Sequence, residues 1–479
     1  MKVLRYALKA LLCVAGVFLI YLILGGLLPF VKAKKVDDDW AKAFDEEAFY
    51  GNGIGPDRAA VIEDSTDALD IRIQMFEQAK ERIVLSTFSI KTDRVSEEVM
   101  ASLLAAANRG VKVQLLIDGL SGGVDMKADP MYYAAGTHPN IEIRYYNIPN
   151  LLKPWTLNSQ LHDKFVLIDD TCLLLGGRNT SNYFLGDYNS KVLSYDREIF
   201  VYNTAHSTDL TSESVMTELY EYFEHLWTLP YTTAVFDSIP FYKEERAETA
   251  EEHLAEVYQT MKEERPELFA EADYEAFTVP TNRISLITNP TNLGPKEPLL
   301  LYQLSSLMTS ADERVFLQTP YAVLNRDMYT LLRTVAQTVP SFDMLLNSTA
   351  VGDNFMASSD YTFNRDKVLA TGVTVHEYQG DHSTHNKSVL IDDDISVIGS
   401  FNFDMRSVYI DTESILVVHG EEFNQLLEQE IFRMKEESLE VAEDGSYLPG
   451  RITPAELSSS RTLLFRITSV VFQLFRFLL

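Results

Sequence analysis

Apolar residues gather at the two ends of the chain, and between the ends they alternate with polar residues in short runs. Residues 10–31 contain no charged side chain. A helix of that length crosses the hydrocarbon core of a bilayer. We therefore predict an uncleaved transmembrane anchor over residues 1–35, in the cell membrane with a single N-terminal pass. The alternatives are a cleaved signal peptide, whose apolar core would be shorter, and a buried globular helix, which seldom has basic residues on both flanks.

The other end of the chain has an amphipathic pattern. Residues 461–479 are apolar apart from three arginines and a few uncharged polar residues. On a helical wheel the arginines fall on one arc and a group of aliphatic residues falls opposite: Leu463, Ile467, Val470, Leu474 and Leu478. A cationic amphipathic helix of this kind is typical of the membrane interface. We predict a membrane-associated segment over residues 446–479; a helix docked on the protein core is the alternative.

Between the ends, one pattern of strands and helices occurs twice. AKERIVLSTF at 79–88 matches ADERVFLQTP at 311–320, and LHDKFVLIDD at 161–170 matches THNKSVLIDD at 384–393. Between these matches, each copy predicts a helix, an apolar strand and an alternating strand: 95–108, 113–117 and 141–146 in one, 328–337, 342–346 and 373–378 in the other. The long and nearly constant offset indicates a duplicated domain rather than a short solenoid repeat. Strands that alternate with helices predict an α/β fold.

A charged stretch separates the two copies. Residues 243–271 are rich in Glu and Ala, with apolar residues at only a few helical positions, and they predict a solvated helical connector. The predicted organisation is a first lobe over 36–240, a connector over 241–280 and a second lobe over 281–445. Each lobe is large enough to bury its own core.

Both copies contain the pattern His-x-Lys-x4-Asp. The residues are His162, Lys164 and Asp169 in the first copy and His385, Lys387 and Asp392 in the second. A histidine and a lysine two positions apart on a strand point to the same face. The aspartate comes five positions after the lysine, so it points the other way or lies at the strand end. We expect it to have a supporting role.

Each motif is followed by a glycine-containing turn that ends in asparagine. The turns are GGRN, ending at Asn179, and GSFN, ending at Asn402. If the two copies meet across a pseudo-twofold axis, two histidines, two lysines and two asparagines share one pocket. Cations and amides then bind the non-bridging oxygens of a phosphodiester. One histidine attacks phosphorus and the other protonates the leaving oxygen.

A glutamate follows each motif inside a strand-like segment. Glu198 lies in YDREIFVYN and Glu413 lies in IDTESILVV. A carboxylate at this place can hold an imidazole in one tautomer. The alternative is an acidic residue at a solvated strand edge.

The formal net charge of −29 argues against a nucleic-acid-binding protein, because such proteins need bases to displace phosphate counterions. An acidic body is also repelled by an anionic membrane, so other segments must supply the affinity for lipid. The two ends are the main candidates. A further candidate is the apolar loop Leu151, Leu152, Trp155 and Leu157, for which packing under the lobe is the alternative. Three basic residues on each side of the anchor favour neither orientation.

The numbers and positions of cysteine and histidine residues limit the disulfides and metal sites that the chain can form. The chain has only two cysteines, which excludes a disulfide scaffold and a cysteine zinc site. His382 lies three positions before His385 but lacks a third ligand. We therefore expect no metal and no cofactor.

With these motifs the sequence resembles the phospholipase D superfamily, which is defined by two His-x-Lys-x4-Asp copies. Residues 55–440 carry the resemblance, and GGRN together with GSFNFDMRS is similar to the bacterial cardiolipin synthase branch. The resemblance implies two α/β lobes, each a mixed sheet flanked by helices, around one shared active site. It also implies metal-independent chemistry through a phosphohistidine intermediate.

Carried over by position, His162 resembles the nucleophile and His385 the general acid and then base. The lysines and asparagines resemble the groups that hold phosphate, and Glu198 and Glu413 match the family's downstream acid. Ser400 matches the serine of Gly-Ser-x-Asn, whereas the first copy has Gly177. The resemblance implies a membrane-bound phosphatidyltransferase that makes cardiolipin from phosphatidylglycerol. A hydrolytic phospholipase D, a nuclease and a non-enzymatic membrane scaffold are the alternatives.

Overall fold

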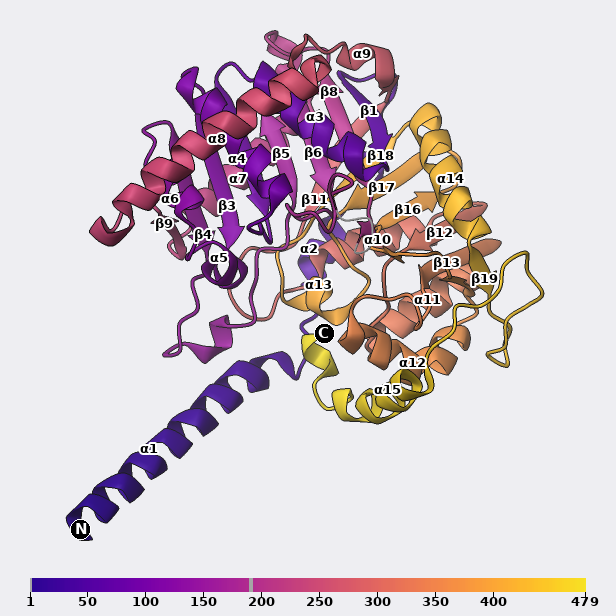
Figure 1. Ribbon diagram of the computed structural model, residues 1–479. Coiled ribbons are helices and arrows are strands. Elements are labelled where there is room, and N and C mark those ends of the chain that lie inside the picture. The colour runs from indigo at the N-terminus through magenta and orange to yellow at the C-terminus, as the bar shows by residue number, and fades with distance from the viewer. Residues whose placement is uncertain (1, 189–192) are drawn as a thin grey trace.

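The computed structural model describes residues 2–188 and 193–479, and it contains two large mixed sheets flanked by helices (Figure 1). The first sheet has nine strands. In spatial order they are β10 (Val279–Pro280), β1 (Asp57–Ile62), β8 (Glu198–Asn203), β6 (Cys172–Gly176), β5 (Phe165–Ile168), β2 (Arg82–Thr87), β3 (Lys112–Asp118), β4 (Ile141–Tyr146) and β9 (Thr232–Val235). Strands β2, β3 and β4 are parallel, and the remaining pairs are antiparallel.

The second sheet repeats this order with eight strands. They are β11 (Arg283–Thr288), β18 (Ser414–His419), β17 (Ile395–Gly399), β16 (Ser388–Ile391), β12 (Arg314–Gln318), β13 (Ser341–Asn347), β14 (Thr374–Tyr378) and β19 (Ser438–Glu440). Strands β12, β13 and β14 are again the parallel set. The same connectivity in both halves confirms the predicted α/β duplication and the mixed sheets.

The strands that carry the repeated motifs lie in the middle of their sheets. Strand β5 lies between β6 and β2, and β16 lies between β17 and β12. Every residue of these four-residue strands is buried. Continuous apolar runs such as FVLI suit a strand that is covered on both faces.

Helices flank both sheets. The larger ones are α3 (Ser65–Gln78), α4 (Arg94–Asn108), α7 (Val215–Thr228), α8 (Glu244–Glu264), α10 (Leu299–Thr309), α11 (Arg326–Thr338), α12 (Phe355–Leu369) and α14 (Glu421–Glu436). Shorter ones are α2 (Asp38–Ala43), α5 (Gly119–Asp125), α6 (Pro130–Gly136), α9 (Tyr274–Phe277) and α13 (Met405–Tyr409). Asp64, Asp93 and Asn325 cap α3, α4 and α11 by accepting backbone N–H groups, which fixes where these helices begin.

One hydrophobic cluster joins the two lobes. Residues of both sheets, including Leu167 and Leu416, pack in it together with Phe223 of α7 and Ile431 of α14. Each lobe also has one hydrophobic cluster of its own under its helices. Because the shared cluster is apolar and buried, the lobes form one body with a fixed junction.

Helix α8, predicted as a solvated connector, instead packs on α4 and α6. Leu254, Val257 and Met261 form its buried stripe. Strand β10 then adds to the edge of the first sheet. The connector is therefore part of the first lobe, because apolar residues spaced three and four positions apart are enough to seat one helical face.

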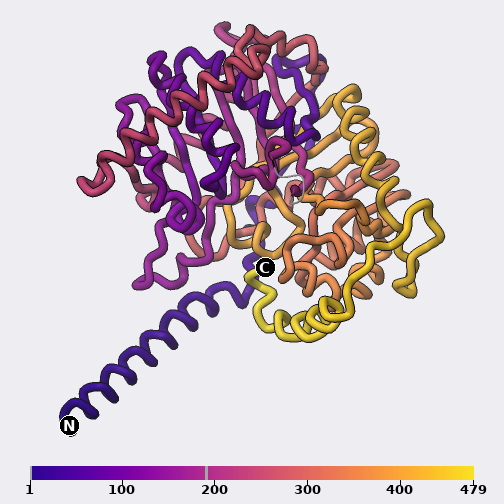
Figure 2. Tube along the Cα trace, in the orientation of Figure 1, coloured from indigo at the N-terminus to yellow at the C-terminus, as the bar shows by residue number. Residues whose placement is uncertain are grey.

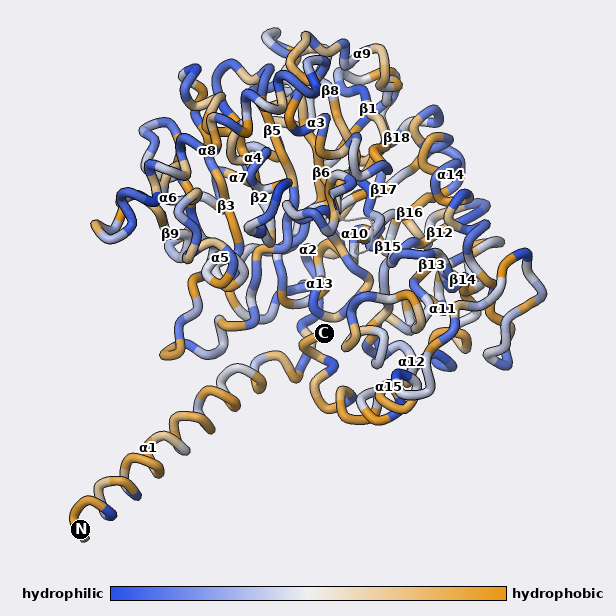
Figure 3. Tube along the Cα trace, viewed as in Figure 1, coloured by the Kyte–Doolittle hydropathy of each residue, from blue (hydrophilic) through white to orange (hydrophobic). Residues whose placement is uncertain are grey.

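The N-terminal helix α1 (Lys2–Leu27) projects away from the body (Figure 1). Residues Val3–Phe30 are the one segment of the described chain long and apolar enough to cross a membrane, and its most apolar stretch is not buried against the protein. Figure 3 shows it as an almost continuous hydrophobic helix. The other end of the chain returns to the base of α1 (Figure 2).

Helix α15 (Ser459–Phe472) lies on α12 and buries Phe465 and Ser469 there, whereas Arg461 and Arg466 are exposed. Thr468 bonds Ser359, and Gln473 and Arg476 bond the buried carboxylate of Asp360. The outward arc is apolar: Leu463, Leu464, Ile467, Val470, Val471 and Leu474 are all about half exposed or more. The helix is thus docked on the second lobe, as one sequence interpretation expects, but it turns its apolar side outward.

Candidate active site

The two motif segments meet at the junction of the lobes, where each runs beside a segment of the other lobe. Strand β15 (Ser383–Thr384) pairs with β7 (Ser194–Tyr195), and Leu161 pairs with Thr412. These pairings bring His385 next to Asp196, which follows β7, and bring His162 next to Glu413, which follows Thr412.

Each histidine contacts a carboxylate of the opposite lobe. His162 Nδ1 lies 2.9 Å from Glu413 Oε1, and His385 Nδ1 lies 2.7 Å from Asp196 Oδ2. Both carboxylates are fully buried, and both imidazoles are largely buried. Because Nδ1 is engaged in each case, Nε2 is the ring nitrogen that remains to meet a substrate.

Asp196, and not Glu198, is the first-lobe carboxylate beside a histidine. Glu198 is 1% exposed and pairs with two arginines: Arg72 Nη1 and Nη2 lie 2.8 and 2.5 Å from its oxygens, and Arg178 Nη1 lies 3.3 Å away. Its negative charge is therefore balanced within the first lobe. The prediction that Glu198 supports the site by holding an imidazole is wrong.

The strand register explains the error. Gly176 pairs with Glu198, whereas the equivalent Gly399 pairs with Ile415. Two residues before these positions come Asp196 and Glu413. Asp196 follows Asn179 by 17 residues, but Glu413 follows Asn402 by 11. The two copies therefore cannot be aligned by spacing, and only the pairing with the glycine strand identifies the equivalent acid.

The same pairing explains why Gly177 replaces serine in the first lobe. In the second lobe Ser400 and Ser407 donate hydrogen bonds to Glu413. In the first lobe a Cβ on Gly177 would lie only 2.4 Å from Asp196 Oδ2. The shorter aspartate lies directly over the glycine, so a serine does not fit there.

The two lysines lie against the histidine backbone. Lys164 Nζ donates to the carbonyl of His162 at 2.5 Å, and Lys387 Nζ donates to that of His385. Lys387 Nζ also lies 3.9 Å from Asp196. Both lysine side chains are almost fully buried, so they place two positive charges in a setting where charge is weakly screened.

The asparagines and two aromatic rings complete the neighbourhood. Within the described chain, Asn179 Oδ1 and Asn402 Oδ1 are buried without a hydrogen-bond partner. The ring of Phe88 lies 5.5 Å from that of His162, and Phe184 lies 5.2 Å from His385. These rings restrict how the imidazoles turn. Neither phenylalanine carries a sequence signal that distinguishes it from core residues.

Asp169 and Asp392 lie at the opposite ends of β5 and β16 from the histidines. Asp169 accepts the backbone N–H groups of residues 80–82 at 2.9 Å, and Asp392 accepts those of residues 312–314 at 2.8–2.9 Å. Both residues have left-handed backbone angles, with φ of 48° and 47°. They fix the start of the neighbouring strand, which agrees with a supporting role and argues against contact with substrate.

Burial sets the protonation of the site. It lowers the pKa of His162 well below its usual value, and Lys164 adds to the effect, so this imidazole is neutral. Burial raises the pKa of Glu413 to about 8 and lowers that of Lys164 to about 8. For Asp196 burial alone would raise the pKa, but Lys387 and His385 outweigh it and lower the pKa to about 2.

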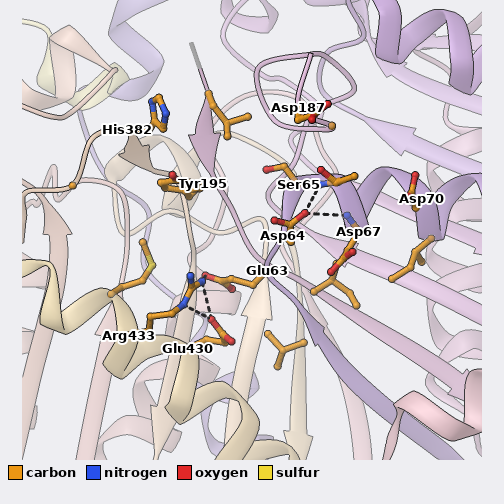
Figure 4. A pocket seen from close by; sticks show the side chains of 18 of the residues that line it. Glu63, Asp64, Ser65, Asp67, Asp70, Asp187, Tyr195, His382, Glu430 and Arg433 are labelled. Atoms are coloured by element: carbon orange, nitrogen blue, oxygen red, sulfur yellow. Dashed lines mark hydrogen bonds and ion pairs between the residues drawn. The ribbon is translucent and has the colours of Figure 1, made fainter. Parts of the chain in front are cut away.

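A large acidic groove opens beside the second histidine, next to Tyr195 and His382 (Figure 4). It has a cavity volume of about 1550 Å³, and its lining contains neither catalytic-motif histidine. Its charged groups are mainly carboxylates: Glu63, Asp64, Asp67, Asp70, Asp187, Glu267, Asp381, Glu430 and Glu437. Such a lining repels phosphate, whereas the buried lysines at the lobe junction attract it.

Comparison with known proteins agrees with this geometry. A family model described as "Cardiolipin synthase, PLD-like domain" matches residues 72–227 and 304–435, more than half of the chain. Cardiolipin synthase C of Escherichia coli K12 is 25% identical over 405 residues, which cover 77% of this chain and 82% of that one. An uncharacterized protein of Helicobacter pylori is also 25% identical, over 76% of each chain.

A solved structure shares the fold. The crystal structure of phosphatidylserine synthase from Haemophilus influenzae matches with a TM-score of 0.61 at 14% sequence identity, covering 88% of this chain and 95% of that one. The architecture, the two motifs and the family match point the same way. This chain belongs to the cardiolipin synthase family of phospholipase D-like proteins.

Proposed function

We propose that this protein is a membrane-bound phosphatidyltransferase that works through a phosphohistidine intermediate. The observation that carries the proposal is the pair of cross-lobe contacts, His162 with Glu413 and His385 with Asp196, beside two buried lysines. Two imidazoles with their Nδ1 atoms engaged offer one nucleophile and one proton donor. The lysine ammonium groups and the amides of Asn179 and Asn402 stabilise the charge on the phosphoryl oxygens.

In the first step His162 Nε2 attacks the phosphorus of a phospholipid. The bond from phosphorus to the leaving alcohol oxygen breaks as the bond from Nε2 to phosphorus forms. His385 gives its Nε2 proton to the departing alkoxide, and the free alcohol leaves. A phosphatidyl group is then held on His162.

In the second step an acceptor alcohol takes the place of the first. His385 removes the proton from its hydroxyl group, the oxygen attacks phosphorus, and the bond to His162 breaks. The histidine is regenerated, and the number of phosphodiester bonds is unchanged. Water as the acceptor gives phosphatidic acid through the same residues.

The unequal carboxylates support this division of roles. Burial and the neighbouring Lys387 lower the pKa of His385 as well, but the ionised Asp196 opposes this shift and so favours the protonated imidazole that a proton donor needs. His162 is kept neutral by burial and by Lys164, as a nucleophile requires. We therefore assign the attack to His162.

Phosphatidylglycerol is the proposed lipid substrate and cardiolipin the proposed product. The family match and the named relatives support this choice. Expression in a bacterial host without cardiolipin, followed by lipid extraction, tests it. Cardiolipin that depends on His162 is the expected result. Phosphatidic acid in its place would identify a hydrolase.

The exposed apolar segments support association of the protein with the bilayer. Helix α1 supplies a candidate span, and α15 turns its aliphatic arc outward. Leu151, Leu152 and Trp155 are also exposed, and Tyr21 of α1 donates to the carbonyl of Leu152 at 2.8 Å. A soluble protein would turn such surfaces inward, whereas a bilayer covers them.

Making the outward arc of α15 polar is expected to separate bilayer activity from chemistry. The variant L463Q/I467Q/V470Q removes apolar area but no contact with α12, so we expect at least about a tenfold loss of activity on lipid vesicles. Activity on a soluble short-chain substrate is expected to stay within about twofold. The control is F432Q, which makes an exposed apolar residue on α14 polar. Equal losses on both substrates would contradict a membrane role for this arc.

The pH profile is expected to be bell-shaped and centred near pH 8. Glu413 must ionise to hold the Nδ1 proton of His162, so kcat/KM rises as pH rises through the pKa of about 8. Lys164 loses its charge over the same range, so activity falls on the alkaline side. Initial rates on a soluble substrate between pH 6 and 10 check this. In E413Q the rising limb should disappear, and a flat wild-type profile would argue against the assignment.

A further inference from the structure

Arg406 of α13 lies between Asn402 and Glu413 in the chain and contacts three separate segments. Its Nε lies 2.9 Å from Asp411 Oδ2. Its Nη2 donates to the carbonyl of Asn158 at 2.7 Å and to the side chain of Gln160. Its Nη1 donates to the carbonyl of Leu478 at 3.3 Å, and its backbone N–H donates to that of Leu479 at 2.9 Å.

Two of these partners lead directly to the first histidine pair. Gln160 precedes His162 by two residues, and Asp411 precedes Glu413 by two. The backbone N–H of Gln160 donates to Asp411 Oδ1 at 3.2 Å, and the carbonyl of Gln160 accepts the N–H of Thr412 at 3.0 Å. Arg406, Gln160 and Asp411 thus form a closed set of hydrogen bonds next to the His162–Glu413 contact.

The other partners lead to the segments with exposed apolar surface. Leu478 and Leu479 follow α15 and pack against the core of the second lobe. Asn158, whose carbonyl accepts from Arg406, donates through its side chain to the carbonyl of Gly26 at the end of α1 at 2.6 Å. One guanidinium group therefore connects both ends of the chain to the segment that carries His162.

The first lobe has a residue at the equivalent position, but in the described part of the chain that residue does not contact the two ends. Counted from the asparagine of each turn, Tyr183 stands where Arg406 stands in the second lobe. Its hydroxyl lies 3.3 Å from Ser383 Oγ and donates to Asp353 at 2.6 Å. Ser383 precedes His385 by two residues, as Gln160 precedes His162. The position thus faces the opposite lobe's histidine segment in both copies, but only Arg406 also holds the two ends.

We propose that Arg406 is a positioning residue for the His162–Glu413 pair and couples the seating of residues 478–479 and the end of α1 to the alignment of that pair. The proposal rests on the catalytic role given to His162 under the proposed function. A planar guanidinium group holds several acceptors at fixed angles, which a lysine ammonium group does not. A misplacement of about 1 Å at a reacting group lowers turnover by about 100-fold.

The test compares R406K, Q160M and a chain that lacks residues 477–479, each otherwise full length and in detergent. Initial rates are measured on a short-chain phosphodiester below its micelle concentration, so that membrane binding does not enter. We expect kcat to fall at least about tenfold in all three, with KM changed less than about threefold. R333K, an arginine change on the exposed face of α11, is the matched control and should behave as wild type.

The conservative variants separate positioning from simple charge balance. R406K keeps the positive charge beside Asp411, so wild-type kcat in R406K would mean that only the charge matters and would overturn the proposal. Q160M leaves Arg406 and Asp411 in place, and wild-type kcat there would overturn it too. If the coupling is real, R406K combined with the deletion should be scarcely slower than either alone, because both interrupt one path. Independent, multiplying losses would contradict the coupling.

A separate measurement distinguishes failure of this inference from failure of the proposed function. Covalent labelling of wild type by a phosphodiester with labelled phosphorus reports the phosphohistidine. No label on wild type would contradict the proposed function itself. Labelling of wild type and of R406K at equal rates would overturn only the role given to Arg406.

Discussion

Alanine at either motif histidine is expected to lower turnover on the order of 10⁴-fold or more while the fold is retained. His162→Ala removes the nucleophile, and His385→Ala removes the group that protonates the leaving oxygen. Both imidazoles lie at the junction of the lobes and not among the apolar side chains of the three hydrophobic clusters, so we expect the fold to be retained. Because the two act as one unit, the double variant should be scarcely slower than either single variant.

Initial rates on a soluble phosphodiester, with thermal unfolding measured in parallel, check this expectation. His382→Ala is the matched control, since this histidine lies beside the acidic groove and outside the histidine–carboxylate pairs. A single variant that keeps a tenth of the wild-type rate would contradict a shared two-histidine site.

Asp196→Asn and Glu198→Gln are expected to fail in different ways although the residues are two positions apart. Asparagine at 196 keeps the shape but loses the charge that holds the Nδ1 proton of His385, so kcat should fall about 10²- to 10⁴-fold. Glutamine at 198 leaves the buried arginines Arg72 and Arg178 without their counter-charge. Breaking a buried ion pair costs about 3–5 kcal/mol of folding stability.

Turnover and thermal unfolding measured on both variants separate the two roles. Asp196→Asn should lose activity well below its unfolding temperature, and Glu198→Gln should lose stability first. Asp392→Asn serves as a control for a carboxylate that holds only backbone N–H groups. Loss of turnover without loss of stability in Glu198→Gln would restore the role that the sequence suggests.

The repeated lobes could be predicted from the sequence because their central strands are buried on both faces. Runs such as FVLI and SVLI are typical of buried central strands. The same order of strands and helices occurs in both halves of the chain. The two His-x-Lys-x4-Asp motifs can also be recognised from the sequence alone. Their histidines and lysines lie within two residues of each other, so local strand geometry is enough to place them together.

Asp196 could not be found this way because its position depends on pairing between strands. The chain between Asn179 and Asp196 is longer than the chain between Asn402 and Glu413. Glu198 is the residue of the same type as Glu413, so the sequence favours it. The hydrophobic pattern of the sequence also does not predict which face of α15 contacts the protein. An amphipathic helix shows two faces, but only the contacts of Asp360 with Gln473 and Arg476 show which face meets the protein.

The central claim is that His162 carries the phosphatidyl group, and trapping that adduct tests it most directly. The variant H385A is mixed with a phosphodiester whose leaving group is p-nitrophenol, which departs without a proton. Because His385 is absent, the acceptor is not activated and the adduct should accumulate. The account predicts a burst of about one p-nitrophenol per protein and a phosphorylated peptide that contains His162. A wild-type protein that turns over without any covalent adduct, or a label on wild-type His385 in place of His162, would contradict it.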